Sequence, residues 1–126
     1  MSTILIVEDN EKNMKLVRDI LQHKGYATLE AHTGDGGVRT ALLARPDLIL
    51  MDIQLPDFDG FEALRRIRED GTLVDVPVIA VSASVMPGDQ QRIVSSGFDA
   101  FVTKPINIKQ FLETVQRALA DGRAPR

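Results

Sequence analysis

The chain has 126 residues, of which 44% are hydrophobic, so it can form the core of one domain but not of two. Its net charge of −3 argues against a surface that binds the phosphate backbone of nucleic acids. The chain has no cysteine, which excludes a disulfide, a thiolate nucleophile and a cysteine-bound zinc. No apolar run approaches the roughly 20 residues of a membrane span. Together these features indicate a small cytoplasmic protein.

The first apolar segment, Ile4–Val7, is β-branched and predicts a strand that ends at Glu8. Asn10 is a suitable N-cap for a helix that extends to about His23, and Gly25 is a suitable stop. The predicted apolar stripe of this helix consists of Leu16, Val17, Ile20 and Leu21, with Met14 at its edge, where a partner protein could contact it.

A second, weaker strand is predicted over Tyr26–Ala31. The segment Thr33–Gly37 contains three glycines, so the following helix is expected to be short, over about Val38–Ala44. The run Leu48–Met51 predicts a third strand buried on both faces, and it ends abruptly at Asp52.

The second half of the chain continues the alternation of helix and strand. The segment 57–60 opens a helix whose inner side carries Phe61, Leu64 and Ile67, and 76–81 predicts a fourth strand with Pro77 near its start. A helix starting at 87–89 is expected to turn Ile93 and Val94 inward and to end at Gly97. The fifth strand is predicted over 98–102, and Asn107 caps a final helix bearing Ile108, Phe111, Leu112, Val115 and Leu119.

Five strands alternating with five helices predict a doubly wound α/β fold, with one parallel sheet in the order 2-1-3-4-5. We find no internal repeat, linker or second domain, and only a short polar tail over 121–126. His23 and His32 are interpreted as surface or edge residues. The segment Arg65–Arg68 is interpreted as a solvated helix face rather than a nucleic-acid patch.

The unusual polar residues all follow the carboxyl ends of predicted strands, where ligands bind in such sheets. Glu8 and Asp9 follow the first strand, Asp52 the third, Ser82 the fourth and Lys104 the fifth. Converging carboxylates repel one another unless a cation lies between them, and Mg²⁺ prefers such oxygen ligands. A carboxylate beside Mg²⁺ can attack phosphorus, with lysine and hydroxyl groups stabilising the transferred group.

Each of these residues taken singly is more often a turn former, a helix cap or a surface lysine. The combination of acidic, hydroxyl and lysine residues at the same end of different strands favours the phosphoryl site. Asp52 is then the nucleophile, with Lys104 and Ser82 facing the phosphoryl oxygens.

The segments "ILIVEDN", "PDLILMDIQLPDFDGFEALRRIR", "PVIAVSA" and "GFDAFVTKPI" resemble, in order and spacing, the receiver domains of two-component response regulators. The resemblance covers residues 1–120 and implies a flavodoxin-like fold without an output domain. The sequence around Glu8 and Asp52 is similar to that of stand-alone regulators of bacterial cell division and polarity.

This resemblance implies that Asp52 accepts phosphate from the phosphohistidine of a histidine kinase or His-phosphotransferase. It implies that Glu8, Asp9 and Asp52, with the backbone carbonyl of Gln54, hold Mg²⁺. The phosphoryl group is expected to contact Lys104 and Ser82, and the Lys104–Pro105 bond is expected to be cis.

The resemblance also implies a switch, in which Ser82 moves toward the phosphoryl group and Phe101 turns inward. A phenylalanine has no hydroxyl to bury, so the inward ring is expected to be common even without phosphate. Gln54 is expected to affect the phosphoryl lifetime, in a direction that the sequence does not give.

The expected output surface is the fourth helix, fifth strand and fifth helix, and the expected state is a monomer or weak dimer. The candidate contacts with kinase or phosphotransferase are Asn13, Met14, Ala83, Pro87 and Ile106.

Other interpretations remain open. The chain could be a phosphorelay intermediate, a receiver excised from a hybrid kinase, or a pseudo-receiver scaffold, although the last usually lacks one of Asp9, Asp52 or Lys104. An aspartyl-nucleophile phosphohydrolase usually needs an acid two residues after the nucleophile, where this chain has Gln54. A flavin-binding protein would need a glycine-rich phosphate loop in place of Glu8 and its neighbours.

Overall fold

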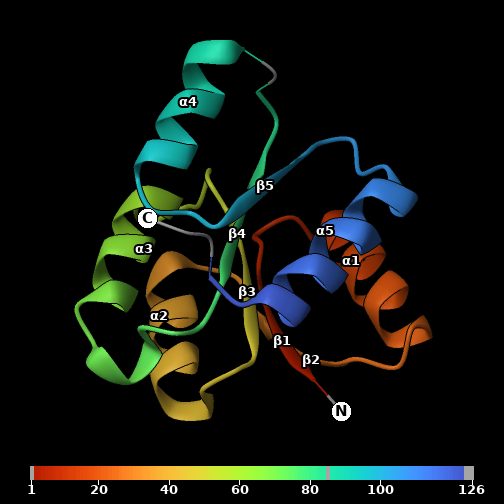
Figure 1. Ribbon diagram of the computed structural model, residues 1–126, viewed down its shortest axis with the longest axis horizontal. Helices are drawn as coiled ribbons and strands as arrows, with labels where there is room; N and C mark the ends of the chain where they lie inside the picture. The colour runs from red at the N-terminus through yellow and green to blue at the C-terminus, as the bar shows by residue number, and fades with distance from the viewer. Residues whose placement is uncertain (1, 85, 124–126) are drawn as a thin grey trace.

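The computed structural model describes residues 2–84 and 86–123. Figure 1 shows a central sheet with helices on both sides. The strands are β1 (Thr3–Val7), β2 (Ala27–Ala31), β3 (Leu48–Asp52), β4 (Val78–Ser82) and β5 (Ala100–Thr103). The helices are α1 (Glu11–His23), α2 (Gly34–Ala44), α3 (Gly60–Arg68), α4 (Pro87–Ser95) and α5 (Ile108–Asp121), with a 3₁₀ turn η1 (Gly71–Leu73) before β4.

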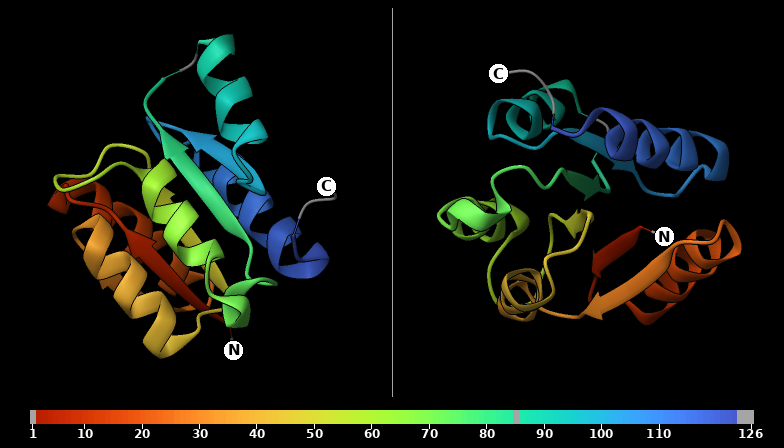
Figure 2. Two further views of the ribbon diagram at one scale, coloured as in Figure 1. Left: turned by 90° about the vertical axis from the view of Figure 1, so that its left-hand side faces the viewer. Right: turned by 60° about the horizontal axis from the view of Figure 1, so that its bottom comes forward.

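The strands form one parallel sheet in the order β2-β1-β3-β4-β5, which confirms the predicted doubly wound fold. The chain leaves β1 toward one edge and returns on the other side as β3, so strand order reverses between these two strands. Val7 of β1 pairs with Met51 of β3, and this register brings the residues after β1 beside the end of β3. The two further views in Figure 2 show the same central strands with helices on either side.

Strand β3 is buried along its whole length, as its continuous apolar run predicts. Leu48 and Leu50 face the core beneath α1 and α5, whereas Ile49 and Met51 face the core beneath α2, α3 and α4. Figure 1 shows these two helix layers on opposite sides of the sheet. Within the described residues, no helix is long and apolar enough to cross a membrane.

Helix α1 has the predicted ends, since the Asn10 side chain accepts a hydrogen bond from the Asn13 N–H and Gly25 adopts a φ of 90°. The predicted inner face of this helix is wrong in part. Met14 is completely buried, whereas Leu16 is 39% exposed. The spacing of Met14, Val17 and Leu21 places them on one helical face, and Leu16 lies nearly opposite. Met14 is therefore a core residue, and the expectation that a partner contacts it is wrong.

The expected short helix over Val38–Ala44 is also wrong, because α2 begins four residues earlier, at Gly34. The Thr33 hydroxyl accepts a hydrogen bond from the Gly36 N–H and caps this end. A Cβ atom on Gly34 would lie 2.5 Å from the Phe58 ring, and one on Gly37 would lie 2.7 Å from Val7. These glycines let α2 pack closely against the sheet and the 53–59 loop, and this packing outweighs their low helix propensity.

Two expectations for exposed and buried side chains also need correction. Val94 was expected to face inward, but it is 59% exposed, while its neighbour Ile93 is buried. Arg68 was expected on a solvated face, but its Nη2 donates to Asp99 Oδ2 at 3.0 Å, and its Nη1 donates to the Leu73 carbonyl. Arg65, by contrast, is exposed as predicted. Both exposed histidines also match their interpretation as surface residues.

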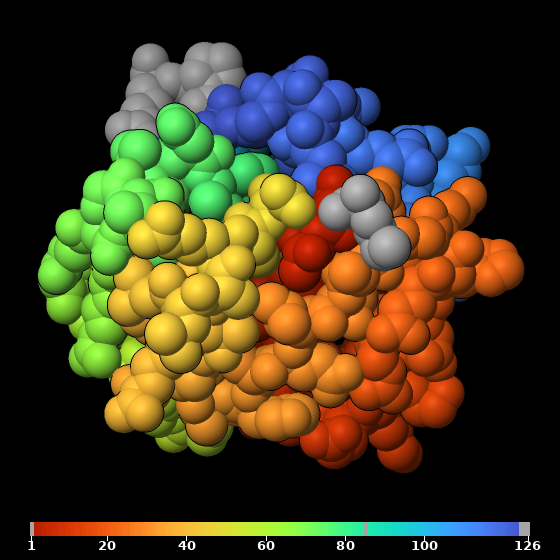
Figure 3. Space-filling view, turned by 90° about the horizontal axis from the view of Figure 1, so that it is seen from below, coloured from red at the N-terminus to blue at the C-terminus, as the bar shows by residue number. Residues whose placement is uncertain are grey.

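Asp99 forms a buried polar centre at the amino end of the sheet. Its carboxylate accepts hydrogen bonds from Arg68, from Arg123 and from the Val78 N–H. Arg123 also donates to the Val74 carbonyl at 2.9 Å. Figure 3 shows the 71–77 segment, in green, beside the end of α5, in blue. This cluster attaches the segment after α5 to the loop that leads into β4.

Candidate functional site: an acidic and lysine cluster at the carboxyl edge of the sheet

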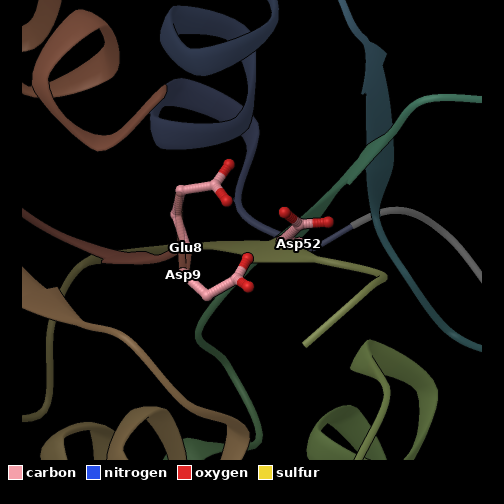
Figure 4. Close-up of side chains that lie close together, drawn as sticks. All are labelled: Glu8, Asp9 and Asp52. Atoms are coloured by element: carbon pink, nitrogen blue, oxygen red, sulfur yellow. The ribbon is translucent and has the colours of Figure 1, made fainter. Parts of the chain in front are cut away.

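Three carboxylates converge at the point where strand order reverses. Glu8 and Asp9 follow β1, and Asp52 is the last residue of β3. One carboxylate oxygen from each lies within 4.8 Å of the others, as Figure 4 illustrates. Glu8 and Asp52 are 4% exposed, while Asp9 is exposed. The parallel register of β1 and β3 thus brings together residues that are more than 40 positions apart.

Lys104 supplies the opposite charge. Its ammonium Nζ lies 2.7 Å from Asp52 Oδ2 and 3.0 Å from Glu8 Oε1. The Lys104 N–H donates to the Ser82 carbonyl at 2.8 Å, which fixes the backbone after β5 to the end of β4. The Lys104–Pro105 peptide bond is cis, as expected.

Burial and neighbouring charges both shift the pKa values of the buried Glu8 carboxyl and the half-buried Lys104 ammonium. Burial raises the pKa of the Glu8 carboxyl, and the hydrogen-bonded Asp52 carboxyl raises it further. Burial by itself would lower the pKa of the Lys104 ammonium, but hydrogen bonds and attraction from Asp52 and Glu8 outweigh it, so this pKa is raised. The site therefore favours a bound positive charge beside its carboxylates.

The loop after Asp52 is held by backbone and side-chain hydrogen bonds. The Gln54 N–H donates to Asp52 Oδ1 at 3.0 Å, and the Gly60 N–H donates to the Ile53 carbonyl at 2.8 Å. Asp57 then caps α2 from outside, because its two carboxylate oxygens accept from the N–H groups of residues 34 and 35, each at 2.8 Å. These contacts fix the segment that carries the Gln54 carbonyl.

A pocket of about 200 Å³ opens beside Asp52. The predicted residues Ser82 and Lys104 line it, together with Gln54 and Ala83. The other lining residues are Ile53, Phe61, Ser84, Asp89, Arg92 and Ile93. Ser82 Oγ accepts a hydrogen bond from the Ser84 N–H at 3.1 Å. The pocket gives a small anionic group access to Asp52, with a lysine and a hydroxyl on its walls.

The residues present fit a hard divalent cation. All three acidic groups offer oxygen ligands, at least two of them are held in place, and Mg²⁺ in proteins binds through one or two carboxylates with water and phosphate oxygens. Burial and the neighbouring Asp52 carboxyl both raise the pKa of Glu8. A cation between the two carboxylates would relieve their repulsion.

The remaining predicted residues lie around this edge. Ala83 and Pro87 are exposed, and Asn13 and Ile106 are half-buried, so all four stay candidate partner contacts. Phe101 is half-buried on edge strand β5 and packs against the core beneath α3 and α4. The expectation for its inward ring remains a prediction.

Sequence reasoning missed two features of the site. The capping of α2 by Asp57 joins residues 22 and 23 positions apart, and only the folded loop brings them together. Arg92 of α4 stacks on the Phe61 ring, with its Cζ 3.9 Å from the ring centroid, at the wall of the pocket. A helical pattern indicates that Arg92 is on a polar face, but it does not indicate which ring it meets.

Comparison with known proteins agrees with this geometry. Residues 4–116 match the model of the response regulator receiver domain. The chain is 45% identical to the polar-differentiation response regulator DivK of Brucella anthropi, over 95% of this chain and 98% of that protein.

Solved structures give the same result. The chain is similar to the receiver domain of sensor histidine kinase PA1611 from Pseudomonas aeruginosa, whose structure has a magnesium ion coordinated in the active-site cleft, with 34% identity, 94% and 98% coverage and a TM-score of 0.88. It is also similar to chemotaxis protein CheY4 of Vibrio cholerae, with 28% identity, 93% and 98% coverage and a TM-score of 0.86. The chain belongs to the response regulator receiver domain family of two-component signalling proteins.

Proposed function

We propose that this protein is a stand-alone response regulator whose Asp52 accepts a phosphoryl group from the phosphohistidine of a histidine kinase or His-phosphotransferase. The observation that carries the proposal is the 2.7 Å contact between Lys104 Nζ and Asp52 Oδ2. Both residues line the pocket, and Glu8 and Asp9 lie close to Asp52. The DivK relative, which the chain matches over 98% of its length, supports a receiver over residues 1–120 that acts without an output domain.

In the proposed reaction an Asp52 carboxylate oxygen forms a bond to phosphorus. The phosphorus–nitrogen bond of the donor breaks, and the imidazole nitrogen leaves with the electron pair and takes up a proton. Glu8, Asp9, Asp52 and the Gln54 carbonyl would hold Mg²⁺, which supplies positive charge to the phosphoryl oxygens. Lys104 and the Ser82 hydroxyl bind the other phosphoryl oxygens. The protein thereby promotes only its own phosphorylation and dephosphorylation.

The output of the proposed switch is a change in protein–protein contacts at the surface of α4, β5 and α5. Phosphorylation adds negative charge beside Ser82 and Lys104 and favours the conformation that binds it better. Phe101 on β5 would turn inward in that state. The similarity to a polar-differentiation response regulator supports a role in polarity control. We also expect, from the sequence, a cytoplasmic protein with a part in cell-cycle control that is a monomer or weak dimer.

Intact mass spectrometry after incubation with acetyl phosphate tests the chemistry. We expect one added phosphoryl group in the presence of Mg²⁺, lost on treatment with hydroxylamine because an acyl phosphate is cleaved by that nucleophile. Asp52→Asn is the control, and it should remain unmodified. If the wild type gains no mass and releases no phosphate from the donor, the proposal is wrong. Release of phosphate from acetyl phosphate with no trapped adduct would mean that the adduct hydrolyses too fast to be trapped, whereas turnover of an external phosphate ester would favour the phosphohydrolase.

A further inference from the structure

The strand ends beside the pocket carry more carboxylates than ammonium groups. Glu8, Asp9 and Asp52 place three carboxylates at the strand ends, where Lys104 contributes one ammonium. That ammonium already contacts both Glu8 and Asp52, so its charge is largely offset. With Mg²⁺ bound as proposed, the divalent cation and the ammonium only balance the three carboxylates, so an anionic phosphodonor gains no net attraction here unless another cation faces the pocket.

Arg92 provides such a cation among the residues that line the pocket. It lies on α4, and it lines the same pocket as Asp52 and Lys104. Other arginines of this region are held by carboxylates, as Arg65 and Arg66 are by Glu62. Among the residues that the structure describes, Arg92 forms no ion pair.

The Phe61 ring supports the Arg92 guanidinium in place of a carboxylate. The Arg92 Cζ lies 3.9 Å from the centroid of this ring, which also lines the pocket. A guanidinium stacked on a ring uses its face for the contact and keeps its N–H donors in its own plane. The Asp89 carboxylate, one turn earlier on α4, accepts a hydrogen bond from the Ser84 hydroxyl at 2.6 Å. Its carboxylate offsets part of the Arg92 charge, but it does not pair with it.

We infer that Arg92 is a further anion-binding residue of the phosphoryl pocket, which attracts the phosphodonor and contacts the phosphoryl group through its free N–H donors. Planar guanidinium groups match phosphate oxygens with two parallel hydrogen bonds. Because Arg92 belongs to α4, this contact also joins the phosphoryl group directly to the proposed output surface. The inference rests on the proposed phosphorylation of Asp52.

The test measures the rate at which acetyl phosphate modifies the full chain with Mg²⁺, at low and at high salt. Arg92→Gln is expected to slow modification about three- to tenfold at low salt and to weaken the salt dependence, because an attractive charge near the site is lost. Arg92→Lys should restore most of the rate, since it keeps the charge. Arg39→Gln is the matched control, because it removes the same charge from an exposed arginine of α2 that is paired with Asp35 outside the pocket.

Phe61→Leu separates charge from packing. It removes the aromatic support but leaves Arg92 charged, so it should retain the salt dependence that Arg92→Gln loses. The inference is overturned if Arg92→Gln and Arg39→Gln behave alike, or if Phe61→Leu loses rate and salt dependence as fully as Arg92→Gln. An unmodified wild type overturns the proposed function and this inference together, whereas a modified wild type with an indifferent Arg92 overturns only the inference.

Discussion

Replacing Gly60 with alanine tests how tightly α3 packs against the end of β3. Gly60 is the first residue of α3, and its N–H donates to the Ile53 carbonyl. A Cβ atom at this position would lie 2.6 Å from the Asp52 carbonyl oxygen and 3.0 Å from the Ile53 Cα. Both are backbone atoms, and neither can rotate away. The helix start or the strand end must therefore move.

Two opposing effects determine the size of the change. Alanine is favoured over glycine inside a helix by about 1 kcal/mol, and by less at its first position. Overpacking a rigid site costs about 1–3 kcal/mol. Because the contact is with backbone, we expect Gly60→Ala to lower the free energy of unfolding by about 1–2 kcal/mol. The same displacement moves Asp52, so modification by acetyl phosphate should also slow.

Urea unfolding followed by far-ultraviolet circular dichroism measures this change, since the chain has no tryptophan. Gly71→Ala is the matched control, because nothing lies within 4 Å of a Cβ atom at that position. It should be as stable as the wild type or slightly more stable, through a less flexible unfolded chain. If Gly60→Ala is as stable as Gly71→Ala, the reasoning from the close backbone contact is refuted.

Three other substitutions give separate tests. Asp57→Ala should lower the free energy of unfolding by about 1 kcal/mol at neutral pH, through loss of the α2 cap. Burial raises the pKa of the Asp57 carboxyl, but hydrogen bonds from backbone N–H groups outweigh it, so this pKa is lowered in the folded protein. The stabilisation by Asp57 is therefore fully present above the unfolded value of 3.8 and is lost as the pH falls through the lowered pKa. A difference in urea midpoint between wild type and variant that is the same at all pH values would contradict this. Asp99→Ala should lower the free energy of unfolding by about 3 kcal/mol, because it leaves the half-buried Arg68 guanidinium without its carboxylate and the Val78 N–H without its acceptor. Urea unfolding measures this loss, and a loss no larger than that of a surface substitution would contradict the expectation. Lys104→Met leaves Asp52 without its cation, so Mg²⁺ should raise the melting temperature of this variant more than that of the wild type, and equal shifts would argue against a shared site.

The alternation of apolar runs and capped helices is enough to predict this fold from the sequence. Strand β3 is apolar throughout because both of its faces are covered, and Asn10 marks the start of α1 because its side chain satisfies a free N–H group. The site residues follow from the same pattern, since parallel strands bring their carboxyl ends to one edge. The sequence therefore predicts that Asp52 and Lys104 lie at one edge and contact the same phosphoryl group.

Contacts between distant segments could be decided only by the tertiary structure. The sequence pattern predicts Met14 at the edge of the apolar stripe of α1. In the fold, the helix face that contains Met14 packs against the sheet, and Leu16 is left exposed. The glycines of α2 predict a weak helix, but in the fold the Phe58 ring packs directly against Gly34, where a larger residue would not fit. Propensity and periodicity are properties of neighbouring residues, whereas these contacts depend on which surfaces meet when the chain folds. The Arg92–Phe61 stack at the pocket, and with it the additional cation, is of this second kind.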